Sequence, residues 1–259
     1  MLDRAFDHPL EPEEHASAPF AGGIKQHGYQ CGMTWGAALA AGAQAYNLYG
    51  TGPEAETRAL LAAQRLVDTF RAQNNAVDCI DITDIDKSSS IWRMLWFFLV
   101  KGGTIACFRM AARYARAALD DVNSALSAED IELPPAPVSC AAILAHQLGA
   151  SDLHTVMAAG LAGGIGLYGG ACGALGAAIW IMGLRLQEEQ TVKNLFSDET
   201  LCSRFDQLAD RFLQSTDYEF ECSEIVGRKF ENVADHAAFL RSGGCSDIIE
   251  ALAAGAPAE

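Results

Sequence analysis

The feature that most constrains the fold of this 259-residue chain is an internal repeat at a spacing of 141 residues. Residues 21–37 align without a gap with residues 162–178. The identical pairs are Gly22 with Gly163, Gly23 with Gly164, Ile24 with Ile165, Gly28 with Gly169, Cys31 with Cys172, and Gly32 with Gly173. A Cys-Gly pair flanked by glycines at the same spacing is too specific for a chance match of Gly/Ala-rich segments. The chain is therefore expected to contain two copies of one unit.

The same order of features continues beyond this segment in both halves. The matching landmarks are residues 66–70 with 208–212, Cys79 with Cys222, and, after a Gly-Gly pair in each half, Cys107 with Cys245. Residues 127–137 contain three prolines and no apolar period, which is typical of a linker. We therefore predict a first domain over residues 1–126, a Pro-rich linker over 127–137 and a second domain over 138–259.

The apolar pattern is helical almost throughout. Apolar residues recur at three-to-four-residue spacing over residues 54–73, 108–126, 138–148 and 201–214. Alanine is abundant and β-branched residues are few, which favours closely packed helices. The one alternating stretch, residues 77–85, is too short to build a sheet. We predict an all-α protein of two homologous helical-bundle domains related by pseudo-twofold symmetry.

Charge and hydropathy limit the partners. The formal net charge of −15 should repel phosphate backbones, so nucleic-acid binding is not expected, and it also argues against membrane association. Residues 155–184 carry no charge and are long enough to span a bilayer, but they are rich in glycine and lack a flanking basic cluster, so we interpret them as buried. Trp92, Trp96, Phe97 and Phe98 are expected in the core or an inter-domain face. If they were exposed, they would imply a partner.

Eight cysteines carry the candidate chemistry. The first residues form neither a basic nor an apolar signal region, so we expect a cytoplasmic protein whose thiols stay reduced. There, this many cysteines favours metal binding or catalysis over structural disulfides, with ordinary core burial as the alternative. The chain contains no Cys-x-x-Cys, which disfavours zinc ribbons and thioredoxin-type sites, and no Cys-x-x-Cys-His, which excludes covalent c-type haem.

The four cysteines of the second half carry a resemblance to a known family. Cys140 lies in Ser-Cys-Ala-Ala-Ile, Cys172 in Cys-Gly-Ala-Leu-Gly-Ala, Cys222 in Cys-Ser-Glu-Ile-Val-Gly, and Cys245 follows Gly-Gly. This pattern resembles the bacterial C_GCAxxG_C_C family of redox-active proteins over residues 138–252. One position departs from the family pattern, because Ala177 stands where the last motif glycine is expected and Gly176 lies one place earlier.

The first half resembles the same family less completely. Cys31, Cys79 and Cys107 match the second, third and fourth cysteines, whereas the first would fall before Met1. The first motif also contains the bulky Trp35. We therefore expect a degenerate copy in which these three cysteines form a second, incomplete site.

The resemblance implies redox chemistry, and similar domains accompany iron–sulfur and haem centres in larger bacterial proteins. Four thiolates satisfy either a tetrahedral zinc ion or an iron–sulfur cluster. We predict such a metal or cluster site at Cys140, Cys172, Cys222 and Cys245, with Gly173 beside it. The centre would carry electrons or support a partner redox protein, and a homo-oligomer stays open.

Two alternatives to a redox metal centre remain at this point. The first is a metal-free protein that cycles a dithiol and a disulfide, for example Cys172 with Cys222. The second is a non-catalytic helical scaffold with structural zinc or no metal. Whether the chain catalyses a reaction by itself is left open.

The remaining candidate ligands are interpreted as structural. Cys202 has no counterpart in the first half and lies in an amphipathic segment. His27 lies four residues before Cys31 and is a candidate replacement for the missing ligand, but a lone histidine is more often a surface or core residue. The same interpretation applies to His146 and His154.

Overall fold

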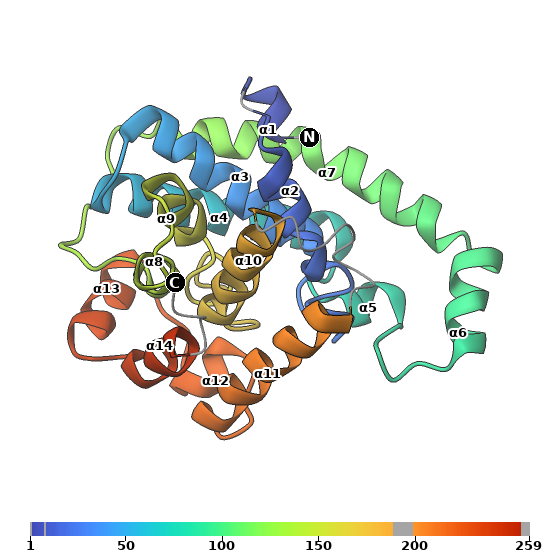
Figure 1. Cartoon of the computed structure of the whole chain (residues 1–259). Coiled ribbons are helices and arrows are strands. Elements are labelled where there is room, and N and C mark those ends of the chain that lie inside the picture. Colours follow the sequence, from blue (N-terminus) through green and yellow to red (C-terminus); the bar gives the residue numbers. More distant parts are fainter. Residues whose placement is uncertain (1, 8, 189–198, 255–259) are drawn as a thin grey trace.

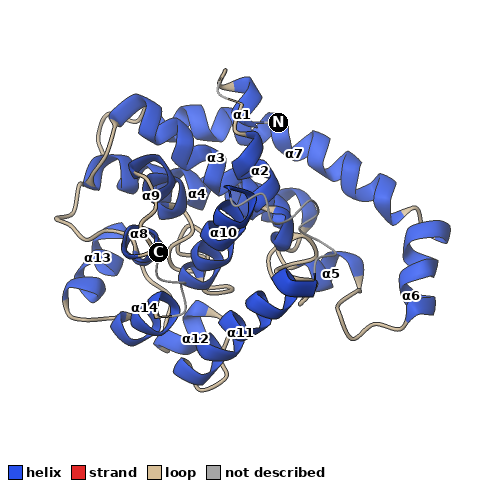
Figure 2. Cartoon of the chain, viewed as in Figure 1, coloured by secondary structure: helices blue, strands red, loops and turns tan. Residues whose placement is uncertain are grey.

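The computed structural model describes residues 2–7, 9–188 and 199–254. Over these residues the protein consists of helices joined by turns, with two isolated bridges and no strand (Figures 1 and 2). This confirms the prediction of an all-α protein. The pseudo-twofold relation between the halves stays a prediction.

The helices follow the same order in both halves. The first half contains α1 (Leu2–Ala5), α2 (Glu11–Ala16), η1 (Ala18–Phe20), α3 (Gly32–Tyr49), α4 (Pro53–Asn74), α5 (Cys79–Thr83), α6 (Ile91–Leu95), η2 (Trp96–Val100) and α7 (Gly103–Leu126). The second contains α8 (Cys140–Gln147), α9 (Asp152–Ala159), α10 (Gly173–Glu188), α11 (Glu199–Ser215), α12 (Cys222–Val226), α13 (Val233–Arg241) and α14 (Ser246–Ala253). In each half, two short helices precede two long ones, and the first long helix begins directly after a cysteine.

Local sequence signals set several helix ends. Ser139 and Ser151 cap α8 and α9, because their hydroxyl oxygens accept hydrogen bonds from the amides of Ala142 and His154. Helix α4 ends at Asn75, whose φ of 60° is the left-handed conformation that asparagine tolerates at a helix end. These caps place the starts of α8 and α9 independently of tertiary packing.

The two halves share one hydrophobic core. Helix α2 of the first half packs on α10 of the second, and α9 of the second packs on α3 of the first. The two contacts are reciprocal: a Cβ on Gly42 of α3 would lie 2.5 Å from the Cα of Met157, and one on Gly183 of α10 would lie 3.1 Å from the carbonyl oxygen of Ala16. Glycine at these positions lets the helix backbones approach closely. The two repeats are therefore separate in the sequence, but their helices pack against one another in a single core.

A buried glutamine also joins the halves. Gln30 is fully buried, its side-chain Nε2 donates to the carbonyl of Gly164 at 3.1 Å, and its Oε1 accepts from the amide of Ala171 at 2.9 Å. The repeat places Ala171 at the equivalent position of the second half, so this side-chain bridge exists in one direction only.

Replacing Gln30 by alanine is expected to lower the free energy of unfolding by about 2–4 kcal/mol, because the Gly164 carbonyl and the Ala171 amide would lose their partner away from water. Urea unfolding measures the change. Gln147→Ala is the matched control, since Gln147 is exposed on α8, and it should shift the free energy by less than about 0.5 kcal/mol. Equal losses at the two positions would contradict the bridging role of Gln30.

The prediction that the aromatic run is buried is wrong. Trp92 is 81% exposed and Trp96 is 56% exposed, whereas Phe97 is half-buried. Helix α6 and η2 lead away from the body of the molecule, and α7 returns to it (Figure 1). The prediction failed because aromatic composition alone does not say whether another element of the chain covers a segment.

The long uncharged stretch is not one helix. Helix α9 ends at Ala159 and α10 begins at Gly173, with a glycine-rich turn between them. Within the described residues, no single helix combines the length and apolar character needed to cross a membrane. One bent pair passes that test of length and composition: residues 91–100 together with α7, at an angle of 62°.

Candidate functional site

Each half carries a left-handed turn shortly before its Cys-Gly pair. The angle φ is positive at every residue of 22–26 and again of 163–167, including Ile24 at 54° and Ile165 at 61°. Such values are strained for a β-branched residue, so the buried surroundings must hold the turn in place. The recurrence of this uncommon conformation shows that the repeated sequence folds into the same local structure twice.

A short antiparallel bridge then sets two cysteines side by side in each half. In the second half, the amide of Cys172 donates to the Phe220 carbonyl at 3.0 Å and the amide of Cys222 donates to the Gly170 carbonyl at 2.7 Å. In the first half, the amide of Cys31 donates to the Val77 carbonyl at 2.9 Å and the amide of Cys79 donates to the Tyr29 carbonyl at 2.7 Å. The backbone thus pairs the second and third cysteines of each copy in the same way.

The other two cysteines of the second half join this pair. Cys140 begins α8 and is buried, whereas Cys245 directly precedes α14 and is half-buried. Helix α14 packs on both α8 and α10, which brings Cys245 to the cluster. The pKa of Cys245 is raised first by its hydrogen bond with Cys140, then by burial and by the charges of Cys140, Cys172 and Cys222. The structure therefore brings together all four cysteines that the family pattern marks.

Cys140 is the cysteine of the cluster whose ionised form its surroundings favour. Its pKa is held well below the usual range, most strongly by the adjacent Cys245. Burial opposes this shift, while His236 and the backbone amide of Gly163 add to it. A donor from the left-handed turn, a thiol and an imidazole therefore all stabilise negative charge on one sulfur.

His236 is the site residue that sequence reasoning missed. It lies on α13 and is 1% exposed, with its Nδ1 atom 2.9 Å from the carbonyl oxygen of Val138. Since a carbonyl only accepts, Nδ1 carries a proton, whereas Nε2 is buried and has no hydrogen-bond partner in this structure. Burial alone lowers the pKa of His236, but the interaction with Cys140 and the hydrogen bond with Val138 outweigh it and raise the pKa.

A weak signal for this histidine was present in the sequence. His236 is the one histidine between the third and fourth cysteines of the second half, and the first half has none in the corresponding interval between Cys79 and Cys107. The family pattern names cysteines only, so it did not draw attention to this position.

The remaining two cysteines of the cluster have raised pKa values. Burial, with a smaller contribution from nearby Cys140, raises the pKa of Cys172 to about 12, although the amides of Leu175 and Ala174 at the start of α10 oppose the shift. Burial also raises the pKa of Cys222 well above its usual range. The surroundings thus favour the ionised form at Cys140 and the protonated form at the other three sulfurs.

The first half gathers three cysteines without an activating partner. Burial, with smaller contributions from the neighbouring Cys79 and Cys107, raises the pKa of Cys31 to about 12, although the amide of Met33 opposes the shift. Burial is also the main cause that raises the pKa of both Cys79 and Cys107. Among the described residues, no histidine acts on these three thiols. This incomplete site therefore lacks the thiolate of the second half.

The other histidines lie elsewhere. The Nε2 atom of His27 is 3.0 Å from the ammonium nitrogen of Lys87, and its ring stacks on Phe220. His154 pairs with Glu13 at 2.9 Å, and His146 is exposed. The backbone of Cys202 lies in α11, but its side chain is outside the described part of the structure.

Gly173, which was predicted to lie beside a cofactor, lies against the protein backbone. A Cβ at this position would be 1.8 Å from the carbonyl oxygen of Leu161. The equivalent Gly32 would place its Cβ 2.9 Å from the carbonyl oxygen of Phe20. The motif glycine therefore lets the first turn of the long helix pack directly on the backbone of the preceding turn. This close packing positions the adjacent cysteine.

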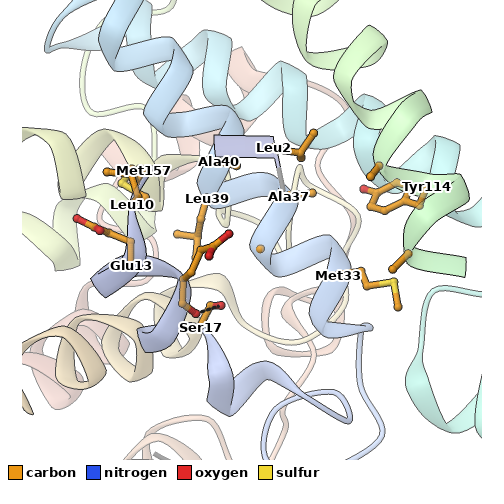
Figure 3. Close-up of a pocket in the computed structure, with 14 residues that line it drawn as sticks. Leu2, Leu10, Glu13, Ser17, Met33, Ala37, Leu39, Ala40, Tyr114 and Met157 are labelled. Carbon is orange, nitrogen blue, oxygen red and sulfur yellow. Dashed lines mark hydrogen bonds between the residues drawn. The ribbon is translucent and has the colours of Figure 1, made fainter. Parts of the chain in front are cut away.

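Two cavities flank the first half. One, of about 480 Å³, lies between the segment formed by α6, η2 and α7 and the rest of the molecule. Its lining residues include Cys79, Cys107, Lys25 and Phe97. The other, of about 350 Å³, lies between α1, α2, α3 and α7 and is shown in Figure 3. In that view Glu13 approaches from one side and Tyr114 from the other, and no cysteine is among its lining residues. The second cavity is thus separate from the thiol chemistry.

The four sulfurs of the second half are the donor set for a metal or cofactor. Thiolate sulfur is the ligand that zinc and iron–sulfur clusters use, and backbone amides near sulfur, such as those of Gly163 and Ala174, are typical around clusters. Within the described residues, however, no group of three or more His, Cys, Asp or Glu side chains is arranged to hold one metal ion. The donor chemistry suits a thiolate-ligated centre, while the observed geometry does not close around one ion.

Comparison with known proteins identifies the repeated unit. A family model described as "Putative redox-active protein (C_GCAxxG_C_C)" matches residues 1–118 and again residues 138–256. Each match covers one half of the chain, which confirms the tandem duplication. No match was found among curated proteins or among solved structures.

Proposed function

Because the chain belongs to the C_GCAxxG_C_C family of redox-active proteins, we propose that its redox centre is the thiol cluster of the second half, activated by His236. The observation that supports the proposal is the buried pair of Cys140 and His236, in which each side chain shifts the pKa of the other toward its charged form. The thiolate is the form of cysteine that reacts with oxidants and disulfides.

Cys140 and Cys245 form the proposed dithiol/disulfide couple. The Cys140 thiolate attacks an acceptor such as a peroxide or a disulfide, and the Cys245 thiol then attacks the modified sulfur of Cys140. With hydrogen peroxide, two thiols and one peroxide give one disulfide and two waters. His236 holds the proton of the Cys140 thiol at Nε2, and the half-buried Cys245 is the member of the pair that reaches solvent.

This pair is favoured over Cys172 with Cys222. Burial keeps both of those sulfurs protonated, so neither is a nucleophile at neutral pH.

A second candidate function uses the same residues as ligands of an iron–sulfur cluster. Cys140, Cys172 and Cys222 all influence the pKa of Cys245, which supports this function, because a cluster requires its four ligands to converge. A bound cluster would supply one-electron transfer. A single zinc ion would need the sulfurs at about 2.3 Å from one point, an arrangement not found among the described residues.

Anaerobic purification followed by metal analysis and mild peroxide oxidation distinguishes these functions. We expect no stoichiometric metal, and one disulfide that peptide mapping assigns to Cys140 and Cys245. Cys245→Ser should abolish that disulfide, whereas Cys107→Ser is the matched control, since Cys107 is also half-buried but lies in the other half.

If the protein is brown and contains iron and sulfide, and both are lost in Cys140→Ser, the iron–sulfur function replaces the dithiol/disulfide function. Colourless, metal-free protein in which Cys140 and Cys245 stay reduced would reject both.

A further inference from the structure

The arm formed by α6, η2 and α7 ends in an apolar tip. The tip consists of exposed residues that no other described part of the chain covers: Ile91, Trp92, Leu95, Trp96, Phe98, Leu99, Val100, Ile105 and Phe108. Trp92, Leu99 and Ile91 are each more than 70% exposed. Exposed side chains of this size, gathered on one segment, mark an interaction site.

A basic collar adjoins the tip. Six of the chain's 18 Lys and Arg residues, and none of its 33 Asp and Glu residues, lie between Lys87 and Leu119. The collar consists of the exposed residues Lys87, Lys101, Arg109, Arg113 and Arg116. Arg93 also belongs to this segment, but it is already paired with Asp84. The net charge of −15 is a sum over the whole chain, in which residues 87–119 are positively charged and the rest is acidic.

We propose that the arm binds the surface of an anionic lipid bilayer, with the apolar tip among the upper acyl chains and the basic collar at the phosphates. A segment that combines exposed Trp, Phe and Leu side chains with Lys and Arg binds in this way, through buried apolar area and attraction to anionic lipid. Tryptophan prefers the membrane–water interface, where two exposed copies of it would lie.

The depth of insertion is limited by the fold. Met110 and Tyr114 of α7 are buried, and the Tyr114 hydroxyl donates to the carbonyl of Leu66 at 3.0 Å, so this part of the helix stays on the body. Only the segment before Met110 is free to enter lipid. The arm therefore lies in the interface and does not cross the bilayer.

A second copy of the chain fits the surface less well. A symmetric contact between two tips would bring one basic collar against the other, and residues 87–119 provide no acidic side chain to offset the repulsion. The rest of the chain is strongly acidic, so it repels an anionic surface and leaves the arm as the part that approaches it.

The tryptophans provide a built-in probe for the test. Trp35 and Trp180 are fully buried, while Trp92 and Trp96 are exposed. Vesicles of phosphatidylcholine with phosphatidylglycerol should carry the protein upward in flotation and shift its fluorescence to the blue. Pure phosphatidylcholine vesicles should bind it weakly, and added salt should release it from the anionic vesicles.

Paired variants separate the two parts of the surface. Arg109→Gln with Arg116→Gln should weaken binding to anionic vesicles roughly 20- to 30-fold. Trp92→Ser with Leu99→Ser should weaken it by about tenfold or more. The matched controls are Arg241→Gln and Tyr218→Ser, which change exposed residues outside the arm and should bind as the unmodified protein does.

Three results would overturn the proposal. The first is binding to neutral and anionic vesicles with equal strength. The second is loss of binding that is the same in the arm variants and the controls. The third is no vesicle binding together with a concentration-dependent dimer that Trp92→Ser and Leu99→Ser abolish, which would make a second copy the occupant. Oxidation of Cys140 with Cys245 is read separately, so failure here leaves the redox proposal intact.

Discussion

Replacing His236 by alanine is expected to raise the pKa of Cys140 and so to lower its ionised fraction at neutral pH. The variant removes the imidazole, while burial continues to raise the pKa of Cys140 and Cys245 continues to lower it. A free cysteine with a pKa of about 8.5 is only about 3% ionised at pH 7, so the reaction of Cys140 with peroxide should slow by up to about 30-fold.

Thiolate ultraviolet absorbance and the peroxide reaction rate, both followed against pH, measure this effect. The pKa of Cys140 is lowered in the folded protein, so the rate should rise at a pH below the free-cysteine value, and in His236→Ala it should rise at a higher pH than in the unmodified protein. His154→Ala is the matched control, because His154 is a largely buried histidine that pairs with Glu13 and acts on no cysteine. An unchanged profile in His236→Ala would remove the basis of the proposed function.

The sign of the linked stability follows from the same two shifts. The lowered pKa of Cys140 contributes stability that is present above the pKa of an unfolded cysteine and is lost as the pH falls through the folded value. The raised pKa of His236 contributes stability that is present below about pH 6.5 and is lost as the pH rises through its folded value. The ionic pair therefore exists between the two folded pKa values, and His236→Ala should remove the dependence due to His236 and reduce the one due to Cys140.

Replacing Gly173 by alanine should cost more stability than any other single methyl addition considered for this chain. The new Cβ would lie 1.8 Å from the Leu161 carbonyl oxygen and 2.5 Å from its carbon, both of which belong to the backbone. Relief requires the start of α10 to move away from the preceding turn and to carry Cys172 with it. We expect the free energy of unfolding to fall by about 3–5 kcal/mol.

Urea unfolding of three glycine variants tests this explanation. Gly36→Ala is the matched control, since Gly36 also lies in the first turns of a long helix but has open space around it, and it should stabilise by about 0.5–1 kcal/mol. Gly32→Ala, at 2.9 Å from the Phe20 carbonyl oxygen, should fall between the two. If Gly173→Ala kept full stability but lost a bound cofactor, the motif glycine would serve the cofactor and not the packing.

The repeated sequence by itself determined the local structure of both halves. Identical Gly-Gly-Ile and Cys-Gly segments at one spacing produce the same left-handed turn and the same bridge, because those conformations depend on neighbouring backbone groups. The helical period likewise predicted the all-α class, because the spacing of apolar residues in each helix marks the face that the helix buries. The family pattern then marked Cys140, Cys172, Cys222 and Cys245, although not which of them is ionised.

Tertiary packing decided the rest. His236 acts on Cys140 because α13 is held against the segment before α8, and no local sequence pattern specifies that contact between distant residues. The aromatic residues of the arm are exposed because no other described part of the chain covers them. Charge state and exposure depend on what surrounds a side chain in space, so the thiolate at Cys140 and the uncovered tip of the arm emerge only in the folded molecule.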